Sequence, residues 1–309
     1  MSAPLFLALP GNQSMAERLA ALAGGDIGTL ESRDFPDGET YLRLPAGLAG
    51  RSVVLVSTLA HPNGKFLPLV FAAGAARELG ASRIGLVAPY LCYMRQDARF
   101  NPGEAVTSRH FASLISQHFD WLVTLDPHLH RYKSLDEIYS IPTRAAHAAP
   151  ALAKWIGDHV QDPFLIGPDE ESAQWVSDVA RASGADYCVL KKQRLGDRDV
   201  RVAPEGLKPL GVRTPVLVDD IISSGKTIQQ AIKAIAPFSH RPPVVLAVHG
   251  VFSDGADAAL ERAGAHLVTT NAVIHPSNRI DIAELLALPA RELANPGGDY
   301  VVSLRTDTP

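Results

Sequence analysis

Short apolar segments alternate with alanine-rich segments along most of the chain. The segments with the length and the branched residues of β-strands are centred on Leu5, Val53, Ile84, Leu122, Leu165, Cys188, Val216, Val245 and Val268. Between them, stretches such as SMAERLAALAG and EESAQWVSDVARASG have helical spacing and end in glycine, as a helix C-cap does. Continuous apolar strands separated by helices predict an α/β fold with mostly parallel sheets flanked by helices.

The pattern predicts two blocks of similar size. A chain of 309 residues has room for about two domains of ordinary size. The segment PTRAAHAAPALAKW, at residues 142–155, has the composition of a junction. We therefore expect one domain over residues 1–145 and a second over 146–286, with the C-terminal segment 287–309 packing back on the first.

Composition narrows the function classes. A formal net charge of −4 gives no general attraction to nucleic acid or to an anionic membrane. The longest apolar run, FLPLVFAAGAA, is about half the length of a membrane span, and the N-terminal sequence lacks the basic start of a secretory signal. Cys92 and Cys188 fit no metal or redox spacing. These features favour a cytoplasmic enzyme with no nucleic-acid or membrane partner.

The stretch PVLVDDIISSGKTIQQAI carries the clearest chemistry. An apolar strand runs into Asp219 and Asp220, and a turn of small residues leads to a helix that begins at about Thr227. Unpaired amides at a helix start can hold a phosphate, and the carboxylates suit sugar hydroxyls or a magnesium ion. A Walker A loop would need glycine at position 220, so that reading fails. The alternative is a chance acidic pair, which adjacent like charges disfavour.

This stretch resembles the phosphoribosyl-pyrophosphate motif shared by type I phosphoribosyltransferases and phosphoribosyl pyrophosphate synthetases. The resemblance implies two type I phosphoribosyltransferase-like domains. It also implies a ribose 5-phosphate site made of Asp219, Asp220, Ser223, Ser224, Gly225, Lys226 and Thr227.

Three stretches of the first block resemble the synthetases, the ribose-phosphate pyrophosphokinase family, and have no place in a simple transferase. They are DFPDGETYLRL, PYLCYMRQDAR and VTLDPHLH. The resemblance implies that ATP is bound by Phe35, Asp37, Gly38, Glu39, Arg95, Gln96, Asp97 and Arg99. The first four would contact adenine from a neighbouring subunit, so the protein would be a homo-oligomer, at least a dimer. Taken singly, DGE is also a common turn and the Arg-Gln-Asp trio a solvated loop.

Two stretches of the second block complete the resemblance, which is nearer to the archaeal-like branch of the family. FLIGPDEES makes Asp169, with His128, a magnesium-linked residue, and VLKKQRLGDRDVRV gives Lys192 and Arg194 a catalytic role. His128 would also be catalytic, and Arg194 would also bind ribose 5-phosphate. The alternatives are a structural histidine and a solvated basic loop. The chain departs from the family where Glu171-Ser172 replaces two glycines and where Lys226 replaces another.

The resemblance predicts an Mg²⁺-dependent enzyme that acts on ATP and ribose 5-phosphate. It would be a ribose-phosphate diphosphokinase that forms phosphoribosyl pyrophosphate and AMP. Two alternatives stay open: a phosphoribosyltransferase, and a catalytically silent paralogue that regulates active subunits.

Overall fold

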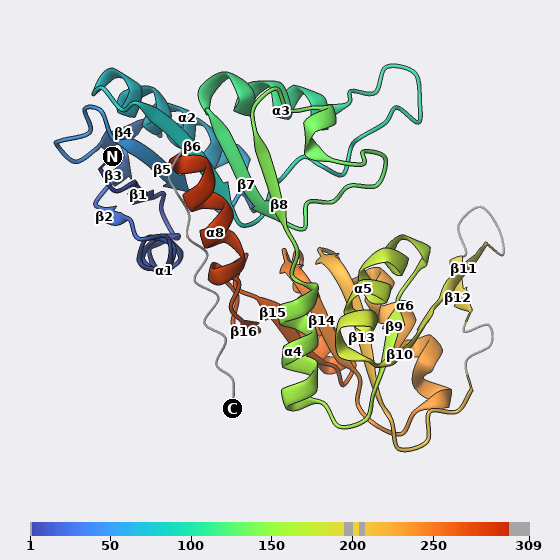
Figure 1. Cartoon of the computed structure of the whole chain (residues 1–309). Coiled ribbons are helices and arrows are strands. Elements are labelled where there is room, and N and C mark those ends of the chain that lie inside the picture. The colour runs from blue at the N-terminus through green and yellow to red at the C-terminus, as the bar shows by residue number, and fades with distance from the viewer. Residues whose placement is uncertain (1, 195–199, 204–207, 297–309) are drawn as a thin grey trace, which may run out of the picture.

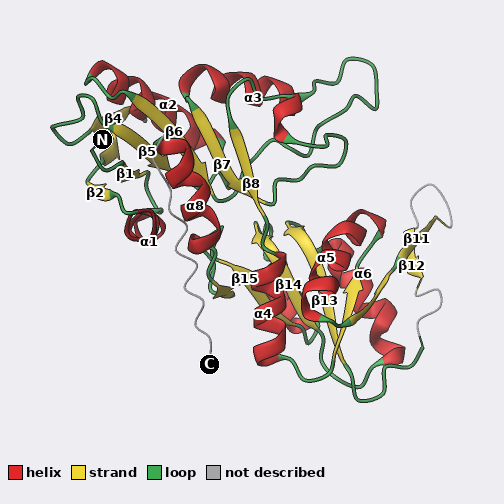
Figure 2. Cartoon of the chain, viewed as in Figure 1, coloured by secondary structure: helices red, strands yellow, loops and turns green. Residues whose placement is uncertain are grey.

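A computed structural model describes residues 2–194, 200–203 and 208–296. These residues form two bodies, each built on a six-stranded sheet in which every described strand pair is parallel. One sheet lies above the other in Figures 1 and 2. The predicted α/β class with parallel sheets is confirmed. No described helix is long and apolar enough to cross a membrane.

The first sheet has the strand order β2-β1-β5-β6-β7-β8. Its strands are β1 (Leu5–Ala8), β2 (Asp26–Gly28), β5 (Ser52–Val56), β6 (Arg83–Ala88), β7 (Trp121–Leu125) and β8 (Thr143–Ala146). Side chains of a strand alternate between the two faces of the sheet. Phe6 and Val54 accordingly pack on the same side as α1 (Gln13–Ala23), and Leu7 and Leu55 pack against α2 (Asn63–Glu78) and α3 (Thr107–His118).

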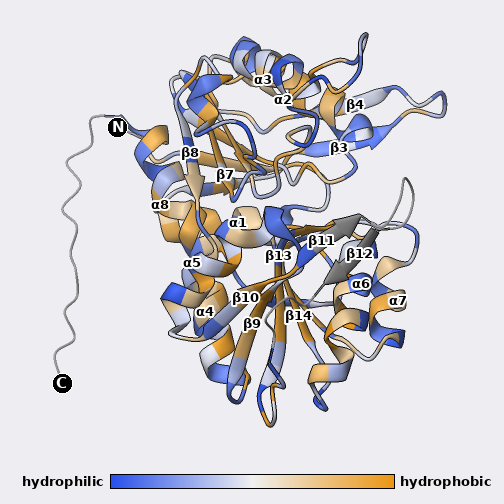
Figure 3. Cartoon of the chain, turned by 90° about the vertical axis from the view of Figure 1, so that its right-hand side faces the viewer, coloured by the Kyte–Doolittle hydropathy of each residue, from blue (hydrophilic) through white to orange (hydrophobic). Residues whose placement is uncertain are grey.

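A small antiparallel hairpin projects from the first body (Figure 3). It consists of β3 (Glu31–Asp34) and β4 (Thr40–Arg43). Gly38 lies at its tip with a φ of 89°, a conformation that glycine adopts at little cost. The periodicity of the sequence did not predict this hairpin, because its residues are polar and half-exposed rather than apolar.

The second sheet has the strand order β10-β9-β13-β14-β15-β16. Its strands are β9 (Pro163–Gly167), β10 (Asp186–Val189), β13 (Thr214–Ile222), β14 (Val244–Gly250), β15 (His266–Thr270) and β16 (Asn278–Ile280). The helices α4 (Ala149–His159) and α5 (Ala173–Ser183) pack with one core cluster, and α6 (Lys226–Ile235) and α7 (Ala256–Arg262) with another. A separate ribbon of β11 (Lys191–Arg194) and β12 (Val200–Ala203) stands beside this body in Figure 1.

The helix α8 (Ala283–Ala294) follows the second sheet in sequence but packs against α1, β6 and β7 of the first body. Its buried residues join the same core cluster as Phe6 and Leu165, which lie in different sheets. One apolar layer therefore runs from one body to the other. We propose that the domains divide near residue 146 and that the chain returns to the first domain through α8. Residues 297–309 of the predicted returning segment lie outside the described residues.

Candidate functional site

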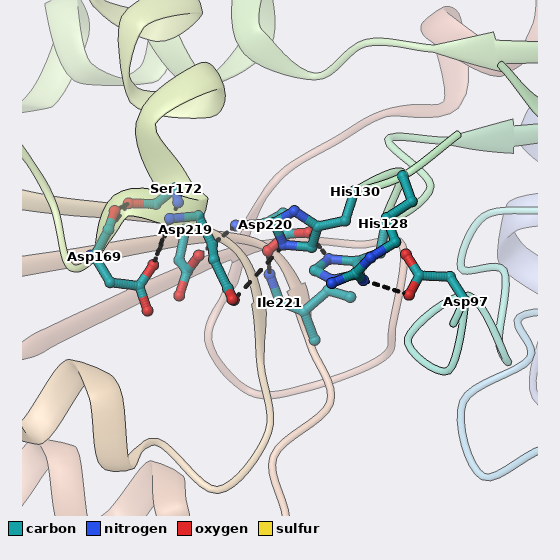
Figure 4. Close-up of polar contacts among 10 residues, drawn as sticks. Asp97, His128, His130, Asp169, Ser172, Asp219, Asp220 and Ile221 are labelled. Carbon is teal, nitrogen blue, oxygen red and sulfur yellow. Dashed lines mark hydrogen bonds and ion pairs between the residues drawn. The ribbon is translucent and has the colours of Figure 1, made fainter. Parts of the chain in front are cut away.

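The end of β7 and the strand β13 bring together residues that are far apart in sequence. His128 follows β7 in the first body, and Asp220 lies within β13 of the second. His128 Nδ1 lies 2.6 Å from Asp220 Oδ2, across 92 positions of sequence (Figure 4). The site therefore lies at the carboxyl ends of two parallel sheets, where ligands bind in open α/β folds.

Asp220 is buried, and both of its carboxylate oxygens have hydrogen-bond partners. Its carboxylate also accepts a hydrogen bond from the backbone N–H of Ile221 at 2.8 Å. Burial alone would raise the pKa of Asp220, but the hydrogen bond and the charge of His128 bring that pKa below its ordinary value. Asp220 is consequently held in its ionised form by the histidine that faces it.

Asp219 behaves in the opposite way. Its Oδ1 accepts a hydrogen bond from the backbone N–H of Asp220 at 3.1 Å. Burial, and then the nearby charges of Asp220 and Asp169, raise the pKa of Asp219 well above its ordinary value. The pair is thus divided into one carboxylate that keeps its charge and one that readily takes a proton.

Asp169 organises the loop that follows β9. Its Oδ1 accepts hydrogen bonds from the backbone N–H groups of Glu171 at 3.1 Å and Ser172 at 3.3 Å. The hydroxyl oxygen of Ser172 accepts in return from the backbone N–H of Asp169 at 3.4 Å, and the hydroxyl donates to the Asp169 carbonyl at 2.6 Å. This capping box closes a 3-10 turn, Glu170–Ser172, at the start of α5. Ser172, one of the departures from the family pattern, therefore has a local structural role.

Glu171, the other departure, reaches across the cleft. Its Oε2 lies 3.6 Å from Nε2 of His130, a residue of the first body. The His130 ring makes an edge contact with that of His128, at 4.5 Å between centroids. A cavity of about 440 Å³ adjoins this cluster and is lined in part by His130, Trp175 and Asp219. Sequence reasoning did not single out His130 or Trp175, because their proximity to Glu171 and to the cavity depends on how the two bodies pack.

The turn after β13 exposes the start of a helix. Gly225, with a φ of 67°, precedes α6, which begins at Lys226. A Cβ at Gly225 would also lie 3.3 Å from Cβ of Ala256, so both the backbone and the space favour glycine. Within the described residues no side chain caps this helix start. Its first amides and the hydroxyls of Ser223, Ser224 and Thr227 suit a phosphate group.

The loop after β6 carries the residues predicted to bind ATP phosphates. Asp97 is buried and pairs with Arg131 at 2.6 Å, which ties this loop to the loop that holds His128. Arg99 donates to the carbonyl of Glu104 at 2.8 Å, and Arg95 is exposed. Gln96 is half-buried, and its carbonyl accepts from the backbone N–H of Ser108. Asp97 thus has a structural partner, and its contact with ATP stays a prediction.

The residues predicted to contact adenine lie on the β3–β4 hairpin. Asp37 accepts from the backbone N–H of Glu39 at 3.1 Å, and Phe35 is 41% exposed. No contact recorded among the described residues joins this hairpin to His128 or Asp220. That these residues contact adenine bound to a neighbouring subunit stays a prediction.

Lys192 and Arg194 lie on β11 of the β11–β12 ribbon. Their side chains, and the loop residues 195–199 that follow, lie outside the part of the chain that the structure describes. Their catalytic role stays a prediction.

The donor set suits a hard divalent cation. The described residues contain no group of three or more His, Cys, Asp or Glu side chains arranged to hold a metal by themselves. Mg²⁺ is usually bound through one or two carboxylates together with the phosphates of a substrate. Asp169 and Asp220 lie close enough to Asp219 for their charges to raise its pKa. These residues fit such an ion. His128, by contrast, contacts Asp220, and its predicted role as a metal ligand with Asp169 stays untested.

Comparison with known proteins shows which family shares this arrangement. Residues 5–118 match the N-terminal domain of ribose phosphate pyrophosphokinase, and residues 134–275 match the phosphoribosyl transferase domain. The ribose-phosphate pyrophosphokinase of Methanopyrus kandleri is 31% identical over 293 residues, which are 94% of this chain and 99% of that protein. That of Sulfolobus acidocaldarius is 32% identical over 281 residues, or 90% and 96%.

A solved structure shares the fold. The crystal structure of phosphoribosylpyrophosphate synthetase from Mycobacterium smegmatis has a TM-score of 0.81 at 24% identity and covers 94% of this chain and 98% of its own. The two bodies are phosphoribosyltransferase-like domains, as predicted. Because the match extends over both bodies and nearly the full length of these relatives, the chain belongs to the ribose-phosphate pyrophosphokinase family.

Proposed function

We propose that the protein is a ribose-phosphate diphosphokinase. It transfers the β,γ-diphosphoryl group of ATP to the 1-hydroxyl of ribose 5-phosphate, which gives phosphoribosyl pyrophosphate and AMP. Family membership supports this reaction, and one observation in the structure carries it: the contact between His128 and Asp220. This contact joins the strand ends of the first body, which would bind ATP, to those of the second body, which carries the sugar-phosphate motif.

The sugar phosphate would bind at the turn after β13. The amides at the start of α6, with Ser223, Ser224 and Thr227, would hold the 5-phosphate, and Lys226 would add a positive charge. Asp219 and Asp220 would hold the ribose hydroxyls. Such groups accelerate the reaction chiefly by fixing the attacking hydroxyl in line with the β-phosphorus.

The nucleotide would bind from the first body. Arg95, Gln96 and Arg99 lie on or near the loop that Asp97 anchors, and would hold the phosphates. Lys192 and Arg194 would offset charge on the β-phosphoryl oxygens in the transition state. Asp169 and the neighbouring carboxylates would hold Mg²⁺, which supplies charge neutralisation at the β- and γ-phosphates. We also propose a homo-oligomer, at least a dimer, and a cytoplasmic location.

Two other functions would use parts of this site. A phosphoribosyltransferase would use the turn after β13 but would leave the first domain without a role. A silent regulatory paralogue is favoured by Glu171, whose charge lies where a diphosphate would bind. Glu171 contacts His130 of the first body, and Ser172 completes the capping box of Asp169, so both substituted residues have structural partners. The diphosphokinase therefore accounts for more of the molecule.

The direct test is product formation. The purified chain is incubated with ATP, Mg²⁺ and ribose 5-phosphate, and AMP and phosphoribosyl pyrophosphate are measured by chromatography. The proposal expects both products in equal amounts and none when ribose 5-phosphate is left out. A transferase or a silent paralogue would form neither, and that result would refute the proposed function.

The substitution Asp219→Asn should weaken substrate binding and at the same time stabilise the fold. The pKa of Asp219 is raised in the folded state, by burial first. Its contribution to stability is therefore complete below the unfolded value of about 3.9 and is lost as pH rises through the folded pKa. Asparagine stays neutral, so the Tm of the variant should exceed that of wild type at pH 8, and the difference should shrink toward pH 4.

The same variant should raise the KM for ribose 5-phosphate by about 10- to 100-fold, since a hydrogen bond to a charged group contributes about 1.5–3 kcal/mol. Thermal melts across pH and steady-state kinetics measure the two effects. An unchanged KM would count against a sugar contact for Asp219, and a lower Tm at pH 8 would count against its raised pKa.

A further inference from the structure

One buried histidine that the proposed chemistry does not use joins the two bodies beside the site. His249 lies in β14 and is 1% exposed. Its Nε2 lies 3.1 Å from the carbonyl oxygen of Leu125 and 3.3 Å from that of Asp126, both at the end of β7 in the first body. Carbonyl oxygens only accept hydrogen bonds, so Nε2 carries the proton and donates it to both.

The backbone that receives this hydrogen bond is in an unusual conformation. Asp126 has a φ of 32°, in the left-handed region that residues other than glycine rarely adopt. Its Oδ2 accepts from the backbone N–H of Ala148 at 2.8 Å, and its Oδ1 pairs with His147 Nδ1 at 2.9 Å. Strained backbone persists where its surroundings fix it. His147 and Ala148, in the link between β8 and α4, fix Asp126 from one side, and His249 fixes it from the second sheet.

His249 also lies close enough to Asp220, the carboxylate that faces His128, for the charge of Asp220 to act on its ring. It stands opposite Ile221 in the register of β13 and β14, one residue after Asp220. Burial lowers the pKa of His249 by more than the charges of Asp126 and Asp220 raise it, so the ring is neutral. Its ring also makes an edge contact with that of Tyr90, at 5.0 Å between centroids.

The second ring nitrogen of His249, Nδ1, does not stabilise the core. Within the described residues, Nδ1 of His249 is buried without a hydrogen-bond partner. A buried acceptor without a partner costs stability, and an apolar side chain of similar size would avoid that cost. The histidine is therefore better explained by what Nε2 holds than by a contribution to the core.

We infer that His249 is a positioning residue, whose Nε2–H fixes the backbone at Asp126 and thereby the contact between His128 and Asp220. The expected effect on kcat rests on the proposed function, whereas the structural role of His249 does not. The chain turns at Asp126 and reaches His128 two residues later, so a shift of that backbone moves the His128 ring relative to Asp220. The turn that would hold the 5-phosphate, Ser223–Thr227, is not touched by this contact.

Three variants separate positioning from packing. In His249→Gln the side-chain amide nitrogen can take the place of Nε2 and donate to the same carbonyls. In His249→Asn the shorter amide cannot reach them, and His249→Leu has no donor. A misplacement of about 1 Å in a site can cost about 100-fold in rate. We expect kcat to fall by about 100-fold in the Leu and Asn variants and to stay within about 3-fold of wild type in the Gln variant, with the KM for ribose 5-phosphate unchanged in all three.

A matched control removes a buried hydroxyl elsewhere in the second sheet. Thr269 Oγ1 bonds Ser277 Oγ at 2.8 Å and accepts from Asn278 at 2.8 Å, all within the second body. Thr269→Val should lower the Tm and leave kcat unchanged at a temperature well below it. If kcat falls in Thr269→Val as it does in His249→Leu, the effect is one of general packing and the inference is wrong.

Hydrogen exchange tests the inference without activity. Exchange at the amides of residues 124–126, 128–130 and of Ala148 should rise in His249→Leu and His249→Asn but stay as in wild type in His249→Gln. Equal exchange in all of them would overturn the inference, as would a Gln variant as impaired as the Asn variant. Should the Leu variant fail to fold, the comparison of Gln with Asn decides. An inactive wild-type protein would refute the proposed function but not this inference, because hydrogen exchange can be measured without activity.

Discussion

Asp220→Asn is expected to lower turnover by about 100-fold or more while the chain still folds. Asparagine has nearly the shape of aspartate but lacks its charge, so His128 loses the carboxylate 2.6 Å away that orients it. Removing one partner of a buried ion pair costs about 3–5 kcal/mol. Because the pKa of Asp220 lies below its ordinary value, its charge contributes to stability at neutral pH, and that contribution is lost as pH falls through the folded pKa.

Kinetics of AMP formation and thermal melts measure this effect. Asp158→Asn is the matched control, because Asp158 pairs with Lys154 at 2.7 Å on the exposed face of α4. Exposed ion pairs contribute little to stability because solvent screens them, so this variant should behave as wild type. Turnover at the wild-type rate in Asp220→Asn would show that the contact between Asp220 and His128 has no role in catalysis.

Lys192→Ala should abolish most turnover with little change in ribose 5-phosphate binding. We propose that Lys192 acts on charge that develops only in the transition state. Losing such a donor typically costs about 3–4 kcal/mol, or roughly two to three decades in kcat. The KM for ribose 5-phosphate should stay within about 2-fold, because the turn after β13 is intact.

The neighbouring lysine provides a close control for this prediction. Lys191 is exposed on the same strand and has no role in the proposed chemistry. Lys191→Ala should therefore retain most of its turnover. Steady-state rates of both variants decide the matter: near wild-type turnover in Lys192→Ala would show that its proposed role is wrong.

The two sheets could be predicted because their inner strands are apolar throughout. Every strand predicted from an apolar segment is present, from Leu5 to Val268. The edge strands β2, β8 and β16 were not predicted. Strands β2 and β16 are three residues long, and β8, with the sequence TRAA, lacks the branched apolar residues of the inner strands and lies in the segment expected to be a junction. The segment DYCVLKK, expected as one strand, is divided at Leu190 into β10 and β11, which belong to different sheets.

The parts of the site could be predicted from single stretches, but their contacts could not. Asp219 and Asp220 stand out because charge interrupts an apolar strand. The contact of Asp220 with His128 depends on how two sheets pack, and no local pattern encodes that. His249 could not be predicted for a similar reason. It lies near the end of an apolar strand, and its hydrogen-bond partners are backbone carbonyls at the end of a strand in the other sheet, whose position no residue type indicates.

Two departures from the family pattern became interpretable only with the fold. Ser172 completes the capping box of Asp169, and Glu171 pairs with His130 across the cleft. Sequence alone left both as acidic or polar residues beside an expected polyphosphate. The partner of Ser172 is three residues away and fits the local capping pattern, whereas the partner of Glu171 lies in the other body, so spacing could not indicate that second contact.

The central claim is that the ends of both sheets bind the sugar phosphate and the nucleotide in a single cleft. A crystal structure with ribose 5-phosphate, Mg²⁺ and a non-hydrolysable ATP analogue tests it directly. We expect the 5-phosphate on the amides at the start of α6 and the triphosphate between the loop of Arg95 and the loop of His128. A nucleotide bound away from the carboxyl ends of β7 and β13 would contradict the account.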